Sequence, residues 1–227
     1  MHPELIVFDL AGTTVKDNQD VHRVLQSALR RNGFEITLEE ANVIMGTPKP
    51  VAIRKLLEDK NYPRITDQFI EQIHTDFVVE MISFYETDDT VGEKEGVSKT
   101  FASLKAHGIK IAVDTGFDRQ ITNALLKRMG WVERNLIDAS VTSDEVENGR
   151  PYPDLIFEAM KRTGVTDVKR VAKVGDTASD MNEGTRAGCH WVVGVTTGSY
   201  SRKNLLLEPH THLIEQLPEL LPIPGIS

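Results

Sequence analysis

The 227-residue sequence is poor in the features that mark secreted and membrane proteins. It contains a single cysteine, Cys189, so no disulfide can form within the chain, which fits a reducing compartment. No apolar run approaches the roughly 20 residues of a membrane-spanning helix. The apolar residues 5–8 behind the N-terminus are also too few for a signal peptide. We therefore expect a cytoplasmic protein that does not engage a membrane.

Positive charge is scarce as well. The chain has 26 Lys and Arg residues against 34 Asp and Glu residues, a formal net charge of −8. A protein that binds nucleic acid needs a basic face, so this balance argues against that class. The apolar share of 40% and the charged share of 26% are those of a soluble globular protein. The length allows one large domain, or a core domain with a smaller insertion.

Short apolar segments alternate with helical patterns along much of the chain. Amphipathic stretches such as 97–107 and 153–163 lie between the apolar segments. This alternation predicts a parallel sheet covered by helices on both faces. The expected fold class is α/β, with a Rossmann-like parallel-sheet core and an inserted helical cap domain. The segments predicted as strands are 5–8, 109–113, 139–141, 171–174 and 191–195.

The stretch between the first and second predicted strands has helical patterns and no convincing strand. Apolar residues recur at helical spacing across 21–29, and 51–57 and 69–84 are interpreted as further helices. Thr37 followed by Glu40 is a capping box, which predicts another helix start. We interpret this stretch as an insertion. The predicted division is a core domain of residues 1–15 and 91–227 and a helical cap domain of residues 16–90.

Polar residues follow three of the predicted strands at the point where each strand ends. Asp9 ends the first strand, Thr115 and Gly116 follow the second, and Asp176 and Asp180 follow the fourth. In an open parallel sheet, ligands bind outside the carboxyl ends of the strands. We therefore expect these side chains to converge although they are far apart in sequence. Each motif alone is more often a cap of a turn or helix, but three such motifs at strand ends favour a site.

Three converging carboxylates repel each other unless a cation lies among them. Mg²⁺ prefers oxygen ligands and is the usual ion beside phosphate. It would offset the negative charge of a phosphoryl group, so that Asp9 could attack phosphorus and form an acyl phosphate that water hydrolyses. Gly116 leaves room for a backbone N–H to approach phosphate oxygens, and Thr115 adds a hydroxyl donor. These residues predict a magnesium-dependent phosphoryl-transfer site.

The motifs resemble those of the haloacid dehalogenase superfamily of aspartate-nucleophile phosphohydrolases. They are Asp-Leu-Ala-Gly-Thr-Thr from Asp9 and Gly-Asp-Thr-Ala-Ser-Asp-Met around Asp176, and the insertion matches the helical cap of that superfamily. The resemblance implies that Asp9 is the catalytic nucleophile. It also implies that Mg²⁺ is held by Asp9, the backbone carbonyl of Ala11 and Asp176, with Asp180 binding through water or holding a neighbouring ligand in place.

Two departures from the common superfamily pattern are informative. Ala11 stands where a second acid is usual, and Arg150 stands where a lysine is usual. Both departures resemble the phosphonoacetaldehyde hydrolase (phosphonatase) family. Alanine cannot protonate the alkoxide that leaves a phosphate ester, whereas a phosphonate has a P–C bond and needs an electron sink instead. Arg150 is expected to hold the nucleophile or a phosphoryl oxygen through its planar fork.

The resemblance also implies a catalytic role for Lys49. In phosphonatases the lysine that forms an imine follows a Met-Gly pair in the cap, as Lys49 does here. An amine condensed with an aldehyde gives an iminium that accepts the electrons of the P–C bond. A free lysine has a pKa of about 10.4, and burial under the cap or a nearby cation such as Arg150 would lower that pKa. The alternative is a surface lysine in a cap turn.

The cap departs from the family pattern at two positions. Ala52 stands where the family has a histidine, and Phe117 stands where it has a tyrosine. Both missing groups could move protons during imine formation. The phosphonatase-like hydrolases, whose substrates can differ, are therefore as good a match as the phosphonatases themselves.

The expected function is that of a hydrolase that cleaves the P–C bond of phosphonoacetaldehyde or a related phosphonate. The reaction would proceed through an aspartyl-phosphate and a Schiff base on Lys49. Thr115, Gly116 and Arg150 are the residues expected to bind the phosphoryl oxygens of this small substrate. A homodimer is a further expectation, because cap-to-cap dimers occur in the resembled family.

Three alternatives stay open at this point. A phosphomonoesterase acting on a small phosphate ester would turn over aryl phosphates and be indifferent to Lys49→Arg. A phosphomutase is less favoured, because Ala11 removes the acid/base that phosphoryl exchange would use. A non-catalytic binding module is disfavoured by the retention of Asp9, Asp176 and Asp180, and magnesium-dependent phosphate release would exclude it.

Overall fold

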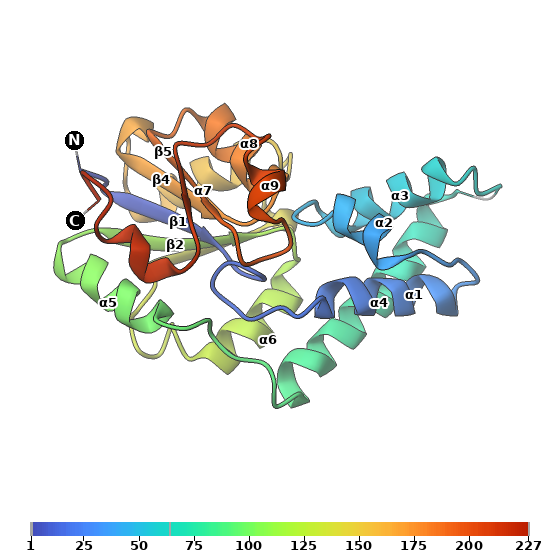
Figure 1. Ribbon diagram of the computed structural model, residues 1–227. Coiled ribbons are helices and arrows are strands. Elements are labelled where there is room, and N and C mark those ends of the chain that lie inside the picture. Colours follow the sequence, from blue (N-terminus) through green and yellow to red (C-terminus); the bar gives the residue numbers. More distant parts are fainter. Residues whose placement is uncertain (1, 64, 227) are drawn as a thin grey trace.

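A parallel β-sheet forms the centre of the computed structural model, which describes residues 2–63 and 65–226 (Figure 1). Its six strands have the order β3-β2-β1-β4-β5-β6, and every neighbouring pair is parallel. The predicted Rossmann-like α/β fold is confirmed. The strands are β1 (Leu5–Asp9), β2 (Lys110–Thr115), β3 (Ala139–Thr142), β4 (Val171–Gly175), β5 (Trp191–Val195) and β6 (His212–Ile214). Sequence reasoning missed only the three-residue edge strand β6.

The position of β1 in the sheet decides where the predicted site residues meet. β1 lies between β2 and β4, and the register places Asp9 opposite Asp114 of β2. The chain runs to one edge of the sheet from β1 through β2 to β3, and then crosses β1 to reach β4. At such a reversal of strand order, a crevice opens between the loops that follow the two central strands. The carboxyl ends of β1, β2 and β4 surround this crevice.

Helices cover both faces of the sheet, as predicted. The side chains of β1 alternate, so that Ile6 and Phe8 join the apolar cluster beneath α5 and α6, while Leu5 and Val7 join the cluster beneath α7. α8 packs on β4 and β5. This burial on both faces explains the nearly continuous apolar runs of the central strands. The helices are α5 (Val97–Ala106), α6 (Arg119–Met129), α7 (Asp154–Thr163), α8 (Ala178–Ala187), α9 (Arg202–Leu205) and the short 3₁₀ helices Ser143–Glu145, Val168–Arg170 and Leu217–Leu220.

Four of the helices between β1 and β2 lie together beside the sheet (Figure 1), and the next one, α5, packs on the sheet. The four are α1 (Asp20–Arg31), α2 (Leu38–Val43), α3 (Lys49–Asp59) and α4 (Asp67–Thr87). The predicted capping box is present: the amide of Glu40 donates to the Thr37 hydroxyl at 3.2 Å, and the amide of Thr37 donates to the Glu40 carboxylate at 2.8 Å. We call α1–α4 the cap; its boundaries at residues 16 and 90 stay a prediction.

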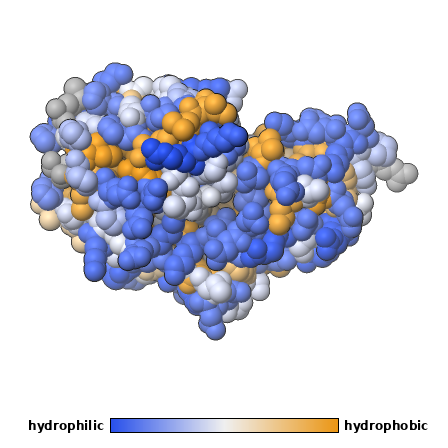
Figure 2. Space-filling view, viewed as in Figure 1, coloured by the Kyte–Doolittle hydropathy of each residue, from blue (hydrophilic) through white to orange (hydrophobic). Residues whose placement is uncertain are grey.

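The cap and the sheet-bearing part share one apolar core. α4 packs on α6, and the ring of Phe77 on α4 lies 6.3 Å from the ring of Phe117, centroid to centroid. At the surface the two parts separate, and Figure 2 shows a hollow between them. A groove there is lined by Val51 of the cap and by Pro151 and Ser179 of the opposite part. Among the described residues, no helix is long and apolar enough to cross a membrane.

Candidate active site

A narrow cavity of about 30 Å³ lies where the carboxyl ends of the central strands meet the cap. Both parts of the chain contribute to its wall, so the site is complete only with the cap in place. Its lining residues are Asp9, Ala11, Asp17, Val21, Met45, Gly46, Lys49, Thr115, Gly116, Phe117, Thr177 and Ser199.

The three carboxylates expected from the strand ends converge. Asp9, Asp176 and Asp180 are all buried, and their ligand oxygens lie within 4.8 Å of one another. Burial raises the pKa of Asp9 to about 8, and Asp180 and Asp176 add to that rise against the opposing effect of Arg150. Burial and Asp180 likewise raise the pKa of Asp176 to about 6. Burial thus disfavours the ionised forms of Asp9 and Asp176, and a hard divalent cation, which would favour those forms, fits these oxygen donors.

Two hydrogen bonds hold the Asp176 carboxylate in one orientation. One of its carboxylate oxygens accepts from the Thr13 hydroxyl at 2.8 Å, and the other accepts from the amide of Ser199 at 2.6 Å. Gly12 has a φ of 91°, and a Cβ built there would lie 2.4 Å from the second oxygen. A side chain at position 12 would thus displace a candidate metal ligand, which explains the glycine there.

Arg150 lies behind Asp9 and is not part of the cavity lining. It is only 2% exposed, and its Nη1 donates to Asp9 Oδ1 at 2.6 Å while lying 2.9 Å from Asp180 Oδ1. Its other nitrogens contact the Asp114 carboxylate and, at 2.9 Å, the Glu183 carboxylate. Of the two roles expected for Arg150, this geometry favours holding the nucleophile over binding a phosphoryl oxygen.

Lys173 is a second buried cation in this cluster, and sequence reasoning missed it. It stands in the middle of β4 with no exposed surface, and its Nζ contacts the Asp114 carboxylate. It also lies 2.9 Å from Glu183 Oε2 and 3.3 Å from Asp180 Oδ1. A lysine inside a strand that is buried on both faces needs acidic partners, so its position in the sequence was a usable signal.

The two cations decide which of the surrounding carboxylates hold their charge. Burial raises the pKa of Asp180, but Arg150 and Lys173 outweigh it and lower that pKa below its ordinary value. Burial and the neighbouring Asp114 raise the pKa of Glu183 to about 8, although Lys173 and Arg150 oppose that rise. The cluster thus combines firmly ionised and weakly acidic carboxyl groups within one hydrogen-bonded unit.

The turn before α3 rests directly on the predicted phosphoryl-binding residues. Thr115 and Gly116 line the cavity, and a Cβ at Gly116 would lie 2.9 Å from the carbonyl oxygen of Gly46. Gly46 has a φ of 77°, and a Cβ there would lie 2.6 Å from Thr177 Oγ1. Gly46 and Gly116 therefore permit a close approach of the cap to the loops that follow β2 and β4.

Lys49 begins α3 and is buried in the cavity wall, with 3% of its surface exposed. Its Nζ lies 5.5 Å from the ring centroid of Phe117 and 5.7 Å from that of Phe77. Burial lowers the pKa of Lys49 to about 8, although the carboxylates of Asp9 and Asp17 favour its charged form. Arg150 adds to the lowering, so both causes expected from the sequence act here, and burial is the larger.

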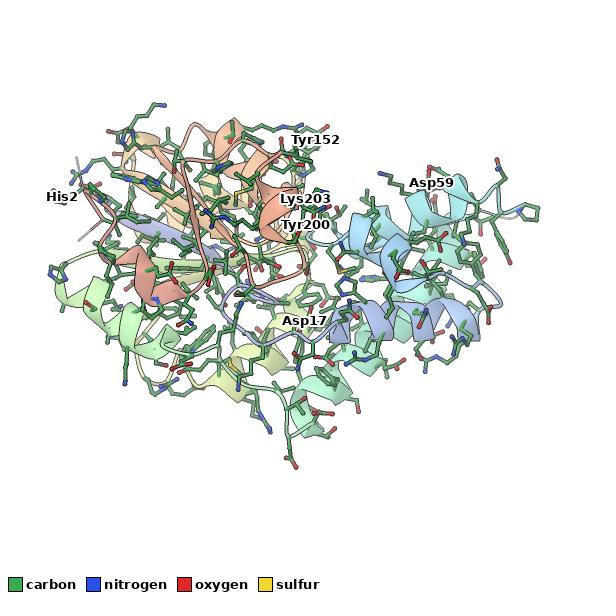
Figure 3. The ribbon with its side chains drawn as sticks, viewed as in Figure 1. His2, Asp17, Asp59, Tyr152, Tyr200 and Lys203 are labelled. Carbon is green, nitrogen blue, oxygen red and sulfur yellow. The ribbon has the colours of Figure 1, made fainter. Side chains whose placement is uncertain are left out.

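Two features of the site bear on the proton-moving residues of the family pattern that this chain lacks. Ala52 is fully buried and Phe117 is almost so, which makes the protein apolar at both positions. Asp17 lines the cavity and was missed by sequence reasoning, because it lies in a linker without a motif. Figure 3 shows Asp17 where the chain passes from the sheet-bearing part into α1.

The sequence matches the family model for the haloacid dehalogenase-like hydrolases over residues 6–194. Phosphonoacetaldehyde hydrolases of two Bacillus cereus strains are 35% identical to this chain over 212 residues, which cover 88% of this chain and 78% of each relative. The chain belongs to the haloacid dehalogenase-like hydrolase family. Hydrolases of this family generally use Mg²⁺, and the buried carboxylates of this member form a cluster that could bind it.

Solved structures of the family share the fold of this hydrolase. A phosphonoacetaldehyde hydrolase-like protein from Oleispira antarctica superposes with a TM-score of 0.83 at 22% identity, covering 97% of this chain and 90% of that one. A hydrolase from Pseudomonas syringae superposes with a TM-score of 0.86 at 21% identity, covering 96% of each chain. At these identities the likeness concerns the fold, and the substrate has to be argued from the site.

Proposed function

We propose that this hydrolase cleaves the P–C bond of phosphonoacetaldehyde or of a closely related carbonyl phosphonate. The observation that carries the proposal is the buried amine of Lys49 in the same cavity as the carboxylate of Asp9. One group can attack phosphorus and the other can condense with a carbonyl. The 35% identity to phosphonoacetaldehyde hydrolases supports the same substrate class.

The phosphoryl half of the reaction belongs to the sheet-bearing part. Asp9 attacks phosphorus, and the hydrogen bond that Arg150 donates from outside the cavity keeps the Asp9 carboxylate in position. Thr115 and Gly116 bind the phosphoryl oxygens. An ion of Mg²⁺ held by Asp9, the carbonyl of Ala11 and Asp176, with Asp180 in support, would offset the negative charge between nucleophile and substrate. Water then hydrolyses the aspartyl-phosphate and releases phosphate.

The carbonyl half belongs to Lys49. The neutral amine adds to the substrate aldehyde, and loss of water from the adduct gives an iminium. When the P–C bond breaks, its electron pair enters the iminium and leaves an enamine on Lys49. The enamine carbon takes up a proton, and water hydrolyses the resulting iminium to free the amine and the product aldehyde. A pKa of about 8 for Lys49 supplies the neutral amine near neutral pH.

Reductive trapping tests this role of Lys49. Borohydride added during turnover of phosphonoacetaldehyde should inactivate the enzyme and leave a stable alkyl adduct that peptide mass spectrometry maps to Lys49. Lys49→Arg keeps the positive charge but cannot form the imine, so it should give no adduct. Phosphate release from phosphonoacetaldehyde without any adduct on Lys49 would overturn the proposal.

Metal removal tests the phosphoryl half separately. Dialysis against a chelator should abolish phosphate release, and Mg²⁺ should restore it, because Asp9 and Asp176 otherwise repel an anionic substrate. Asp9→Asn should lower the rate of phosphate release by about 10⁴-fold or more, since the nucleophile itself is lost. Activity that survives either change would exclude the aspartyl-phosphate route.

A phosphomonoesterase acting on a small phosphate ester is the second candidate. The apolar residues Ala52 and Phe117 favour it, because the groups that move protons in the family pattern are missing. This enzyme would hydrolyse aryl phosphates, whose leaving groups need no acid, and Lys49→Arg would leave its preference among esters intact. A comparison of phosphonoacetaldehyde and an aryl phosphate as substrates of Lys49→Arg separates the two functions.

A further inference from the structure

Imine chemistry on Lys49 needs a group that gives and takes protons within the cavity. The hydroxyl of the first adduct leaves as water only when it is protonated, and the reverse step needs a base. The side chains at positions 52 and 117 are apolar and cannot serve. Among the described residues that line the cavity, the titratable side chains are those of Asp9, Asp17 and Lys49. With Asp9 and Lys49 engaged as nucleophiles, Asp17 is left.

We propose that Asp17 is the acid/base of this enzyme's carbonyl chemistry, an inference that rests on the proposed imine of Lys49. Asp17 lies in the linker that joins β1 to α1, at the boundary between the sheet-bearing part and the cap (Figure 3). Asp17 would therefore approach the substrate from this linker, whereas Asp9 ends β1 and Lys49 begins α3.

The hydrogen bonds of Asp17 fix the carboxyl group and leave half of it unused. Oδ1 accepts from the amide of Asp20 at 2.7 Å and from the amide of Val21 at 3.2 Å, which anchors it at the start of α1. Within residues 2–63 and 65–226, no donor contacts Oδ2. A carboxyl group held through one oxygen, in a cavity wall, can present the other oxygen to a ligand.

The charges around Asp17 suit a group that exchanges protons. Burial raises the pKa of Asp17, while the Val21 amide and the charge of His22 oppose the rise and the charge of Asp20 adds to it. The carboxylate of Asp17 also acts on Lys49, where it favours the ammonium form. A carboxyl group with a raised pKa gives up its proton closer to neutral pH than an ordinary aspartate does.

The proton balance closes over one catalytic cycle. Protonated Asp17 gives its proton to the hydroxyl of the Lys49 adduct; the C–O bond breaks, water leaves, and the nitrogen lone pair forms the C=N bond. After P–C cleavage, the enamine carbon gains one proton, and the water that hydrolyses the aspartyl-phosphate releases one. When a second water adds to the product iminium, the Asp17 carboxylate takes a proton from that water. Asp17 thus ends the cycle protonated, as it began.

Asp17→Asn tests this role, because the amide oxygen can still accept from the backbone amides while the side chain has no acidic proton. The rate of borohydride trapping on Lys49, with phosphonoacetaldehyde, should fall by about 10²-fold or more. The ratio of phosphonoacetaldehyde turnover to aryl phosphate turnover should fall by a similar factor. Asp17→Glu should recover part of the trapping rate.

Asp89→Asn is the matched control for the loss of one negative charge. Asp89 is exposed and does not line the cavity, so the trapping rate and the turnover ratio should both stay within about twofold of the wild type. If Asp17→Asn does not fold, Asp17→Ser retains an acceptor at the start of α1 and likewise lacks an acid. The thermal unfolding midpoint identifies a folded variant.

Three outcomes overturn the inference, and they are distinct. Trapping on Lys49 at the wild-type rate in Asp17→Asn shows that another group moves the protons. An equal fall of phosphonate and aryl phosphate turnover shows a structural role for Asp17. No trapping on Lys49 in the wild type removes the proposed function itself, and the inference falls with it.

Discussion

Lys49 and Lys173 are both buried, yet their surroundings act on their pKa in opposite directions. Burial lowers the pKa of Lys173, but Asp114, Glu183 and Asp180 outweigh that effect and raise it above the ordinary value. Among the residues that the structure describes, no carboxylate contacts Lys49, which lies against the rings of Phe77 and Phe117; burial therefore dominates, and its pKa falls to about 8. The neighbours of a buried amine, rather than its depth, decide its charge.

This difference divides the site into two kinds of surface. In the sheet-bearing part, Arg150 and Lys173 are neutralised by carboxylates and serve to hold Asp9 and Asp180 in place. In the cap, no carboxylate of the described residues pairs with Lys49, and burial lowers the pKa of its amine. A charged network held by ion pairs can serve phosphoryl transfer to Asp9 whatever the leaving group, whereas an amine with a lowered pKa can serve only substrates that carry a carbonyl group. Under the proposed function, the cap is therefore the part that selects the substrate.

Lys173→Met should have the largest effect on stability, about 3–5 kcal/mol lower free energy of unfolding. The substitution removes one of the two buried cations that contact the carboxylates of Asp114 and Glu183, and Arg150 alone remains to offset their charge. Urea denaturation monitored by circular dichroism measures the change. Lys161→Met, which removes an exposed lysine paired with Glu158, should change the free energy by less than about 1 kcal/mol. Equal changes in the free energy of unfolding for Lys173→Met and Lys161→Met would show that the carboxylates around Lys173 do not depend on its charge.

Lys49→Met should raise the free energy of unfolding at pH 7 by about 3 kcal/mol, since one pKa unit corresponds to about 1.4 kcal/mol. The pKa of Lys49 is about 8 in the folded state, below its ordinary 10.5, so the unfolded chain binds more protons between those pH values. Wild-type stability therefore gains from rising pH across that window, and the advantage of Lys49→Met should disappear near pH 10.5. Below pH 8 the full difference should remain.

Urea titrations at pH 7 and pH 10 measure this difference, with Lys55→Met as the control on an exposed site of the same helix. Lys55→Met should show no pH-dependent change relative to the wild type. If Lys49→Met raised the free energy of unfolding by the same amount at both pH values, the pKa of Lys49 would not be lowered in the folded protein.

The titration of Lys49 sharpens the contrast directly. NMR of protein labelled with ¹³C at the lysine Cε atoms should show one resonance with a midpoint near pH 8, absent from Lys49→Arg, while surface lysines titrate above about pH 10. In Asp9→Asn the midpoint should fall further, because the Asp9 carboxylate is the strongest of the charges that favour the ammonium form. An unchanged midpoint in Asp9→Asn would show that the Asp9 carboxylate does not act on the charge of Lys49.

Phe77→Leu should have the smallest effect. The ring of Phe77 faces the amine of Lys49 at 5.7 Å, and a cation–π contact of about 0.5–1 kcal/mol favours the ammonium form. Its loss should lower the pKa of Lys49 by about half a unit in the same NMR titration. Phe101→Leu removes a buried ring that packs on Phe8 and Trp131 instead, so it should leave the Lys49 midpoint unchanged. An equal shift in both variants would contradict the role of the Phe77 ring.

Much of the fold and part of the candidate site could be predicted from local patterns. Apolar runs predict β1 and β4, and the acidic residues that follow them predict the convergence of Asp9, Asp176 and Asp180, because parallel strands end at one edge of a sheet. β6 was missed because three residues of mixed polarity carry too little pattern. The partners of Lys173 were missed because Asp114 of β2 and Glu183 of α8 reach it from two different elements, and no local sequence pattern reports contacts between elements.

The sequence by itself determined that this chain forms a doubly covered parallel sheet with an aspartate at its central strand end, since periodicity and strand-end chemistry are local properties. Lys49 became a candidate through the resemblance to phosphonatases, by its place after a Met-Gly pair. Only the tertiary structure decided which groups hold their charge. A pKa depends on burial and on charges within a few ångströms, and folding brings those neighbours together from distant parts of the chain.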